Sequence, residues 1–380
     1  MARTIVKTLS IAALLSATSL VGVQAAAQDT ARTASSVEFA KFAPSPDRKP
    51  HRIDYSLWTD AMRSLVISMG PSTRTSAGTE ASSFGTRRRY GHNSRYRLEG
   101  TRLMFSQLDN DAKAGFSAYR QDLESVGNSL DIRSLPRNEQ LAYWLNLHNV
   151  AMVEQIALAW PVRQPRSIEI GGVPLDEAKF ITVAGTTMSL KDIRTQIIYP
   201  NWKDPRVIYG LWRGDIGSPS LQREAFDSEN LDRLLDRGAK DLVNSLRGTQ
   251  KNGSTLLVST IFAEAAPFYF GNFEADVRQH IGQYANEEVQ ELLAKTRSVK
   301  ALIVEADIAD LAGGVREPSF NDVTSNGRSR SFRVPPAMAQ LLAQRERKFE
   351  LLERRGERTG TVTFNDIVLP GEEPEDEEIE

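Results

Sequence analysis

Cysteine is absent from all 380 residues of this chain. Without thiols the chain can form no disulfide and can offer no cysteine nucleophile, so thiol chemistry is excluded. Its stability must therefore come from a packed core. Hydrophobic residues make up 40% of the sequence and aromatic residues 8%, which is enough for one sizeable core.

Long hydrophobic runs are also lacking, except for an uncharged run at residues 9–23. Arg3 and Lys7 precede this run, and small residues follow it. The pattern predicts a secretory signal peptide in residues 1–27 and export to the periplasm or the extracellular space, because the run is short for a membrane span. An uncleaved membrane anchor is the alternative. No transmembrane span is expected after signal cleavage.

Neither sign of charge dominates the chain, which has a formal net charge of -2. The signal peptide carries two positive charges and no negative one, so its removal gives -2 minus 2, or -4. This balance argues against nucleic acid as a partner. Glycine-rich phosphate-binding signatures and metal-ligand spacings are missing as well, and we therefore expect no cofactor and no metal.

Composition and periodicity divide the chain into regions. Strands scattered among helices predict an α+β fold, or a layered α/β-like one, built as a helix-rich single domain around a small mixed sheet. The expected regions are the signal peptide (1–27), a linker (28–52), a globular domain (53–314) with an arginine-rich surface loop (70–97), an irregular segment with a C-terminal helix (315–356), and a disordered acidic tail (357–380).

Hydrophobic periodicity places the individual elements. Ser189 and Asp192 have the spacing of a capping box, which predicts that a helix begins there and continues to residue 199. A hairpin is expected from strands at 180–183 and 187–190. Further strands are predicted at 206–212, 255–260 and 301–305, and further helices at 55–69, 100–108, 111–126, 137–160, 230–246, 272–284, 287–295 and 335–355.

The helix predicted at 137–160 is apolar nearly all round, which is typical of a buried helix. We expect it to be the most buried helix and to pack against a sheet that contains residues 206–212 and 255–260. Glu139, Asn146 and Asn149 lie close together on one side of it. These three groups could line a cleft and bind a ligand; alternatively, the two asparagines hold neighbouring backbone in place.

Two segments, RNEQLAYWLNLHNV at 137–150 and KDPRVIYGLWRGDIGSPSL at 203–221, resemble the DUF547 family. The resemblance extends over about residues 53–314 and implies a relationship to papain- or transglutaminase-like folds. The family pattern has two cysteines and a histidine where this chain has Arg213, Ser218 and Thr195. Positions that match the pattern are Asn138, Glu139, Ala142, Trp144, Asn146, Asn149, Ser189, Asp192, Asp204, Pro205, Arg206 and Pro219, whereas His148 and Arg194 stand at positions of Tyr and Glu.

These replacements imply a non-catalytic binding or scaffold module. The alternative is a hydrolase or acyl-transferase that uses Ser218 as nucleophile, with His148 or Glu139 as base. Because a buried guanidinium needs a partner, we expect Arg213 to reach solvent or to pair with an acid such as Asp215, Glu139 or Glu224. Candidate binding residues are Glu139, Asn146, Asn149, Arg213, Arg87, Arg88 and Arg89.

The arginine-rich loop contains six arginines and one acid, Glu80. Arginine forks bind carboxylates and phosphates, so this loop predicts an anionic polymer or a protein of the cell envelope as partner. The alternative is that the arginines cap helix ends or are merely solvated. Seven acids in residues 372–380 predict a tail that competes with such partners for the loop, or one that is only solvated.

Overall fold

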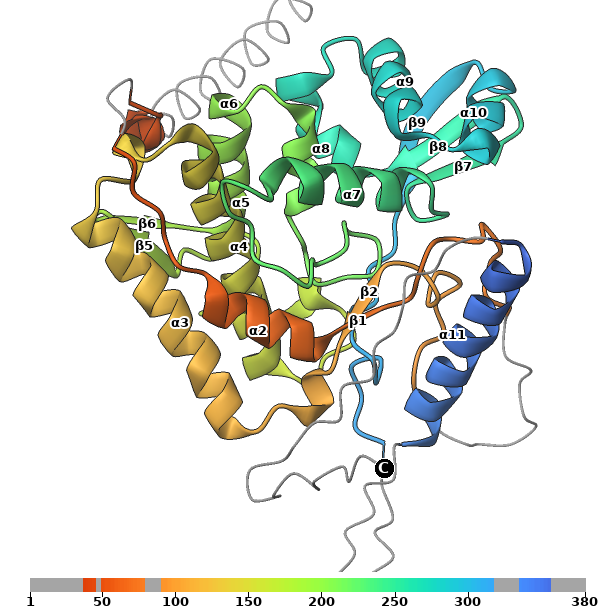
Figure 1. The fold of residues 1–380 in the computed structure, drawn as a ribbon, viewed down its shortest axis with the longest axis horizontal. Helices are drawn as coiled ribbons and strands as arrows, with labels where there is room; N and C mark the ends of the chain where they lie inside the picture. Colours follow the sequence, from red (N-terminus) through yellow and green to blue (C-terminus); the bar gives the residue numbers. More distant parts are fainter. Residues whose placement is uncertain (1–36, 46–48, 79–89, 318–334, 357–380) are drawn as a thin grey trace, which may run out of the picture.

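The computed structural model describes residues 37–45, 49–78, 90–317 and 335–356. The expected signal peptide, the acidic tail, and Arg87, Arg88 and Arg89 lie outside these residues. In the described part, no helix combines the length and the apolar character needed to cross a bilayer. Its main helices are α2 (Ser56–Leu65), α3 (Asn110–Ser129), α4 (Arg137–Ala159), α7 (Leu231–Val243), α8 (Ile261–Tyr269), α9 (Phe273–Tyr284), α10 (Glu287–Ala294) and α11 (Pro336–Arg354) (Figure 1).

Shorter elements connect these helices. The strands are β1 (Val66–Ser68), β2 (Thr101–Leu103), β3 (Glu169–Ile170), β4 (Val173–Pro174), β5 (Ile181–Val183), β6 (Thr186–Met188), β7 (Thr249–Asn252), β8 (Thr255–Ser259) and β9 (Ser298–Ile303). The short helical segments are η1 (Ala40–Phe42), η2 (Phe105–Gln107), η3 (Ile132–Ser134), η4 (Pro165–Ser167), α5 (Leu190–Asp192), the π-helical η5 (Ile193–Ile198), α6 (Tyr199–Asn201) and η6 (Pro205–Gly210).

The helix α4 runs through the centre of the fold, with α3 packed along one side and η5 along another. Trp144 and Leu145 are completely buried. Phe42, from the expected linker, contacts Trp144 edge to face at 5.2 Å between ring centroids, so part of that linker belongs to the core. The prediction that this is the most buried helix is confirmed for the described residues.

The expected packing of α4 against a sheet with strands at 206–212 and 255–260 is wrong, because residues 205–210 form the 3-10 helix η6 and residues 211 and 212 belong to no strand. The side chain of Asp204 accepts a hydrogen bond from the backbone N–H of Arg206 at 2.9 Å, and Pro205 occupies the first turn. Both features favour the start of a helical turn. The apolar run in this segment therefore reflects burial on several sides rather than a strand.

The α+β class is confirmed, but the mixed sheet lies at the edge of the molecule rather than at its centre (Figure 1). Strand β8 pairs antiparallel with β7 and parallel with β9. Helices α9 and α10 pack against these strands. The other strands form separate two-stranded sheets. Helices packed around α4 therefore provide most of the core.

Local patterns predicted several elements correctly. The hydroxyl of Ser189 accepts from the Asp192 N–H at 3.0 Å, and the Asp192 carboxylate accepts from the Ser189 N–H at 2.9 Å. This confirms the capping box. The hairpin β5–β6 is also confirmed, with Gly185 at a φ of 73° in its turn.

Two predicted helices near the N-terminus differ from the structure. Residues 100–108 form β2 and η2, because Gly100 has a φ of 74° and the following residues pair with β1. The helix predicted at 55–69 ends at Leu65, where the β-branched Val66 and Ile67 begin β1. The helix α8 was missed because Pro267 lies inside it.

The C-terminal helix α11 docks on the domain, as the sequence predicted for residues 335–355. Lys348 is buried, and its ammonium donates to the carbonyls of Met69 at 2.8 Å, Gly70 at 3.3 Å and Leu98 at 2.6 Å. Leu352 is completely buried. One cation and an apolar stripe therefore fix α11 beside β1 and β2.

Candidate functional site

The two asparagines of α4 bind backbone of neighbouring segments. The amide of Asn146 donates to the Phe226 carbonyl at 2.7 Å and accepts from the Phe226 N–H at 3.0 Å. Asn149 donates to the Gly210 carbonyl at 2.9 Å and accepts from the Trp212 N–H at 3.1 Å. These contacts fit the structural interpretation, in which the amides hold two loops against α4.

Glu139 lies in the first turn of α4. One carboxylate oxygen, Oε1, accepts from the backbone N–H of Ile53 at 3.0 Å. The other, Oε2, is buried without a hydrogen-bond partner among the described residues. Glu139 therefore holds the irregular segment around Ile53, which precedes α2, against the start of α4.

The positions of the family's cysteine and glutamate converge on one ionic cluster. Arg194 is completely buried and binds Asp176 through two hydrogen bonds, at 2.7 and 2.8 Å. It also donates to both oxygens of Glu264, at 3.0 and 3.1 Å. Arg213 donates to the same two oxygens, at 2.7 and 3.1 Å. Arg213 thus pairs with an acid as expected, but that acid is Glu264 and none of the three named from the sequence.

His148 touches this cluster from α4. Its Nε2 lies 3.3 Å from an Arg194 guanidinium nitrogen, and its Nδ1 lies 3.2 Å from the amide oxygen of Asn149. Burial and the Arg194 charge lower the pKa of His148 from 6.5 to about 3. The imidazole is therefore neutral at pH 7, with Nδ1 donating to Asn149 and Nε2 accepting from Arg194.

Ser218 is buried in a turn and bonded to backbone. Its hydroxyl donates to the Asp215 carbonyl at 2.8 Å, and its N–H donates to the Asp215 carboxylate at 2.7 Å. Neither His148 nor Glu139 is among its hydrogen-bond partners. A serine nucleophile needs a base in contact with its hydroxyl. The described geometry therefore gives the hydrolase alternative no support.

A groove of about 1410 Å³ lies between α7, the β1–β2 pair and α11. The C-terminal end of α2 and the segment 220–223 complete its walls. Hydroxyl and amide groups from Ser64, Thr101, Gln222 and Asn244 line it. We call it the basic groove because six cations also line it: Arg63, Arg223, Arg233, Arg237, Lys240 and Arg345.

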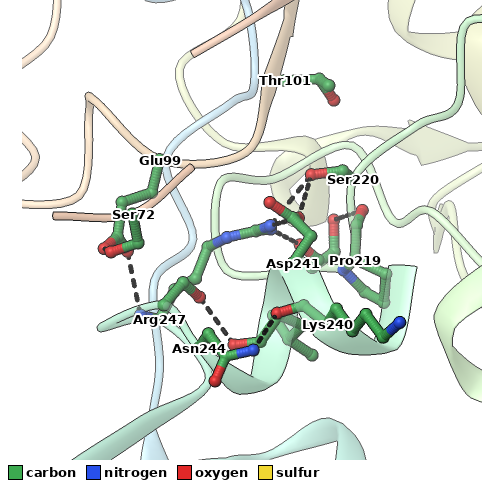
Figure 2. Close-up of polar contacts among 12 residues, drawn as sticks. Ser72, Glu99, Thr101, Pro219, Ser220, Lys240, Asp241, Asn244 and Arg247 are labelled. Atoms are coloured by element: carbon green, nitrogen blue, oxygen red, sulfur yellow. Dashed lines mark hydrogen bonds and ion pairs between the residues drawn. The ribbon is translucent and has the colours of Figure 1, made fainter. Parts of the chain in front are cut away.

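Two acids line the basic groove, and each is bound to an arginine outside the lining. Asp236 accepts from Arg206 at 3.0 Å. Asp241 forms an ion pair with the buried Arg247, which also donates to Ser220 at 2.9 Å. Figure 2 shows the Arg247 guanidinium directed at both groups. The lining nevertheless has six cations against these two acids, which gives it a net positive charge.

Five of the groove cations are exposed, whereas Arg345 is half-buried, donates to the Ser68 carbonyl at 2.6 Å and lies over the Phe349 ring. Arg233 and Arg237 share Glu224, at 2.7 and 3.6 Å. Arg223 donates to a backbone carbonyl, that of Arg63, at 2.9 Å. No ion pair of Arg223 or Lys240 occurs among the described residues. Exposed pairs contribute little, so these cations remain available to an anionic ligand.

The arginine-rich loop uses at least two of its arginines internally. Arg74 donates to the Thr249 carbonyl at 2.8 Å, and the buried Arg97 donates to the Gly78 carbonyl at 2.8 Å. Thr249 lies in β7 and Gly78 lies in the loop itself, so these two bonds are internal contacts and not helix caps. Arg95 is exposed beside the ring of Tyr96. The basic groove was not predicted from the sequence; its signal was the spacing of cations along α7 at 233, 237 and 240.

Comparison with known proteins gives one match. A family model described as "Protein of unknown function, DUF547" matches residues 132–243, a segment that contains α4, Arg213, Ser218 and α7. No curated protein and no solved structure matches the chain. The relationship to papain- or transglutaminase-like folds therefore stays a prediction.

Proposed function

We propose that this chain, whose residues 132–243 belong to the DUF547 family, is an exported, non-catalytic module that binds an anionic polymer of the cell envelope in the basic groove. The net positive charge of the groove carries the proposal, since six cations line it against two acids, Asp236 and Asp241. Export rests on the signal-like pattern of residues 1–27.

The state of the family's reactive positions supports a binding role. Arg213 stands where the family pattern has a cysteine, and its guanidinium is bound to Glu264. Ser218 stands at the second cysteine position with its hydroxyl bonded to backbone. Thr195 stands at the histidine position and donates to the Lys191 carbonyl at 2.9 Å. None of these groups is arranged as a nucleophile with its base.

A polymer suits the shape and chemistry of the groove. Arg233, Arg237 and Lys240 follow one face of α7 at intervals of about one helical turn, near 5.4 Å. A chain with regularly repeated negative charges can contact all three, whereas a small anion contacts one or two. The hydroxyls and amides between them suit the hydroxyl groups of an acidic polysaccharide.

Binding of polygalacturonate to the full chain, measured by calorimetry at low and high salt, tests the proposal. We expect binding at low salt that weakens as salt rises, because added ions screen exposed charge pairs. Dextran, which is neutral, is the matched ligand control and is expected not to bind. Equal binding of both polymers, or none of either, would contradict the proposed function.

A further inference from the structure

The helix α11 brings the C-terminal part of the chain to the basic groove. Arg345 and Phe349 of α11 line the groove, and the Lys348 contacts hold the helix in place. The helix ends at Arg354, about 7.5 Å along the axis from Phe349 at 1.5 Å per residue. Whatever follows this helix therefore starts beside the groove.

The sequence that follows is strongly acidic. Residues 371–380 contain seven acids and no basic residue. Residues 357–380 lie outside the described part, so their sequence alone enters the argument. Fourteen residues, 357–370, separate the last described residue, Gly356, from the acidic segment and can span up to about 50 Å. The acidic segment can therefore reach every part of the groove.

We propose that the acidic segment 371–380 of this chain is itself a ligand of the basic groove and competes there with external anions. This inference rests on the proposed function in treating the groove as an anion site. Charge complementarity supports it, since six cations line the groove and both lining acids are already paired. A tethered segment has an effective concentration on the order of millimolar, so a weak contact suffices.

The sequence predicted that the acidic tail contacts the arginine-rich loop, whereas the contacts of the described residues favour the basic groove. Arg74 of that loop donates to the Thr249 carbonyl, and Arg97 donates to the Gly78 carbonyl within the loop, so these two guanidinium groups are already engaged. Arg223, Arg237 and Lys240 are exposed at the groove instead. The acidic segment 371–380 thus covers the surface that binds the polymer. The polymer must displace this segment to bind, and this lowers the apparent affinity for the polymer.

A full-length variant with a neutral tail tests the competition. Its polygalacturonate affinity at low salt should exceed that of the natural chain by about threefold or more, and high salt should remove the difference. A chain with residues 371–380 in scrambled order retains the charge and should behave like the natural chain. The neutral-tail variant carries Glu372→Gln, Glu373→Gln, Glu375→Gln, Asp376→Asn, Glu377→Gln, Glu378→Gln and Glu380→Gln.

Direct binding of a labelled peptide with the sequence of residues 371–380 separates this inference from the proposed function. By fluorescence anisotropy at low salt, the peptide should bind the neutral-tail chain and lose that binding when Arg223→Glu, Arg237→Glu and Lys240→Glu are added. Peptide binding without polymer binding would support the tail contact and refute the proposed function. No peptide binding, or binding that survives the groove substitutions, would overturn the inference, as would equal polymer affinity with and without the acidic tail.

Discussion

Arg213 donates two hydrogen bonds to Glu264, at 2.7 and 3.1 Å, from the position where the family pattern has a cysteine. Arg194 binds the same carboxylate. Burial acts to raise the pKa of Glu264, but the charges of Arg213 and Arg194 outweigh it and hold that pKa below its usual range. Arg213 is thus part of an ion cluster with the buried Arg194 and with Glu264.

Removing the shared carboxylate should destabilise the protein. Glu264→Ala leaves the buried Arg194 with Asp176 as its remaining carboxylate, and we expect the free energy of unfolding to fall by about 2–4 kcal/mol, measured by urea denaturation. Glu177→Ala removes only an exposed pair with Lys191 and should cost less than about 1 kcal/mol. Equal effects of the two changes would show that the cluster is not structural.

The central helix should tolerate truncation poorly. Trp144→Ala opens a cavity in a fully buried site next to Phe42 and Tyr143, and we expect a loss of about 3–5 kcal/mol in thermal or chemical unfolding. Leu158→Ala, on an exposed position of the same helix, is the control. A loss below about 1 kcal/mol at Trp144 would mean that α4 is peripheral.

The amide of Asn149 should matter for stability through the backbone groups that it binds. Asn149→Ala leaves the buried Gly210 carbonyl and Trp212 N–H without their partner, at a cost of about 1–3 kcal/mol. Asn252→Ala, on the exposed strand β7, should be nearly neutral. A neutral effect of Asn149→Ala on unfolding would favour the ligand-binding interpretation.

Acidification should weaken the fold through His148. Because the pKa of His148 is about 3 in the folded state and 6.5 when the side chain is exposed to solvent, the unfolded state takes up the proton first as pH falls. The contribution of neutral His148 to the free energy of unfolding is complete above pH 6.5 and is lost as pH falls toward 3. At pH 5 the free energy of unfolding is lower by about 2 kcal/mol. In His148→Gln, the loss of stability between pH 7.5 and pH 5 should shrink by a similar amount, as urea titrations at both values would show. An unchanged pH dependence would refute this role.

Local patterns explain which parts of the fold could be predicted. The capping box at Ser189 and the apolar circumference of α4 are encoded within a few turns of chain, so sequence alone was sufficient. The partner of Arg213 could not be predicted in this way. Glu264 is 51 residues away in the sequence, and it lies on α8, which contains Pro267 and so does not have a typical helical sequence.

The candidate site was harder still to predict from sequence. The basic groove joins Arg63, Arg223 and Arg345, which come from three distant parts of the chain. Which of its acids are already paired, as Asp241 is with Arg247, is a property of tertiary contacts. The clustered arginines of the loop were visible in sequence, yet Arg74 binds the Thr249 carbonyl and Arg97 binds the Gly78 carbonyl within the loop.

The salt dependence of polygalacturonate binding in two charge-matched variants tests the central claim most directly. The groove variant carries Arg223→Glu, Arg237→Glu and Lys240→Glu; the control carries the same change of charge at exposed positions outside the groove, Arg166→Glu, Arg297→Glu and Lys179→Glu. We predict that the groove variant loses at least about tenfold in affinity at low salt and most of the salt dependence, whereas the control retains both. Equal losses in the two variants would show that net charge, and not the basic groove, binds the polymer.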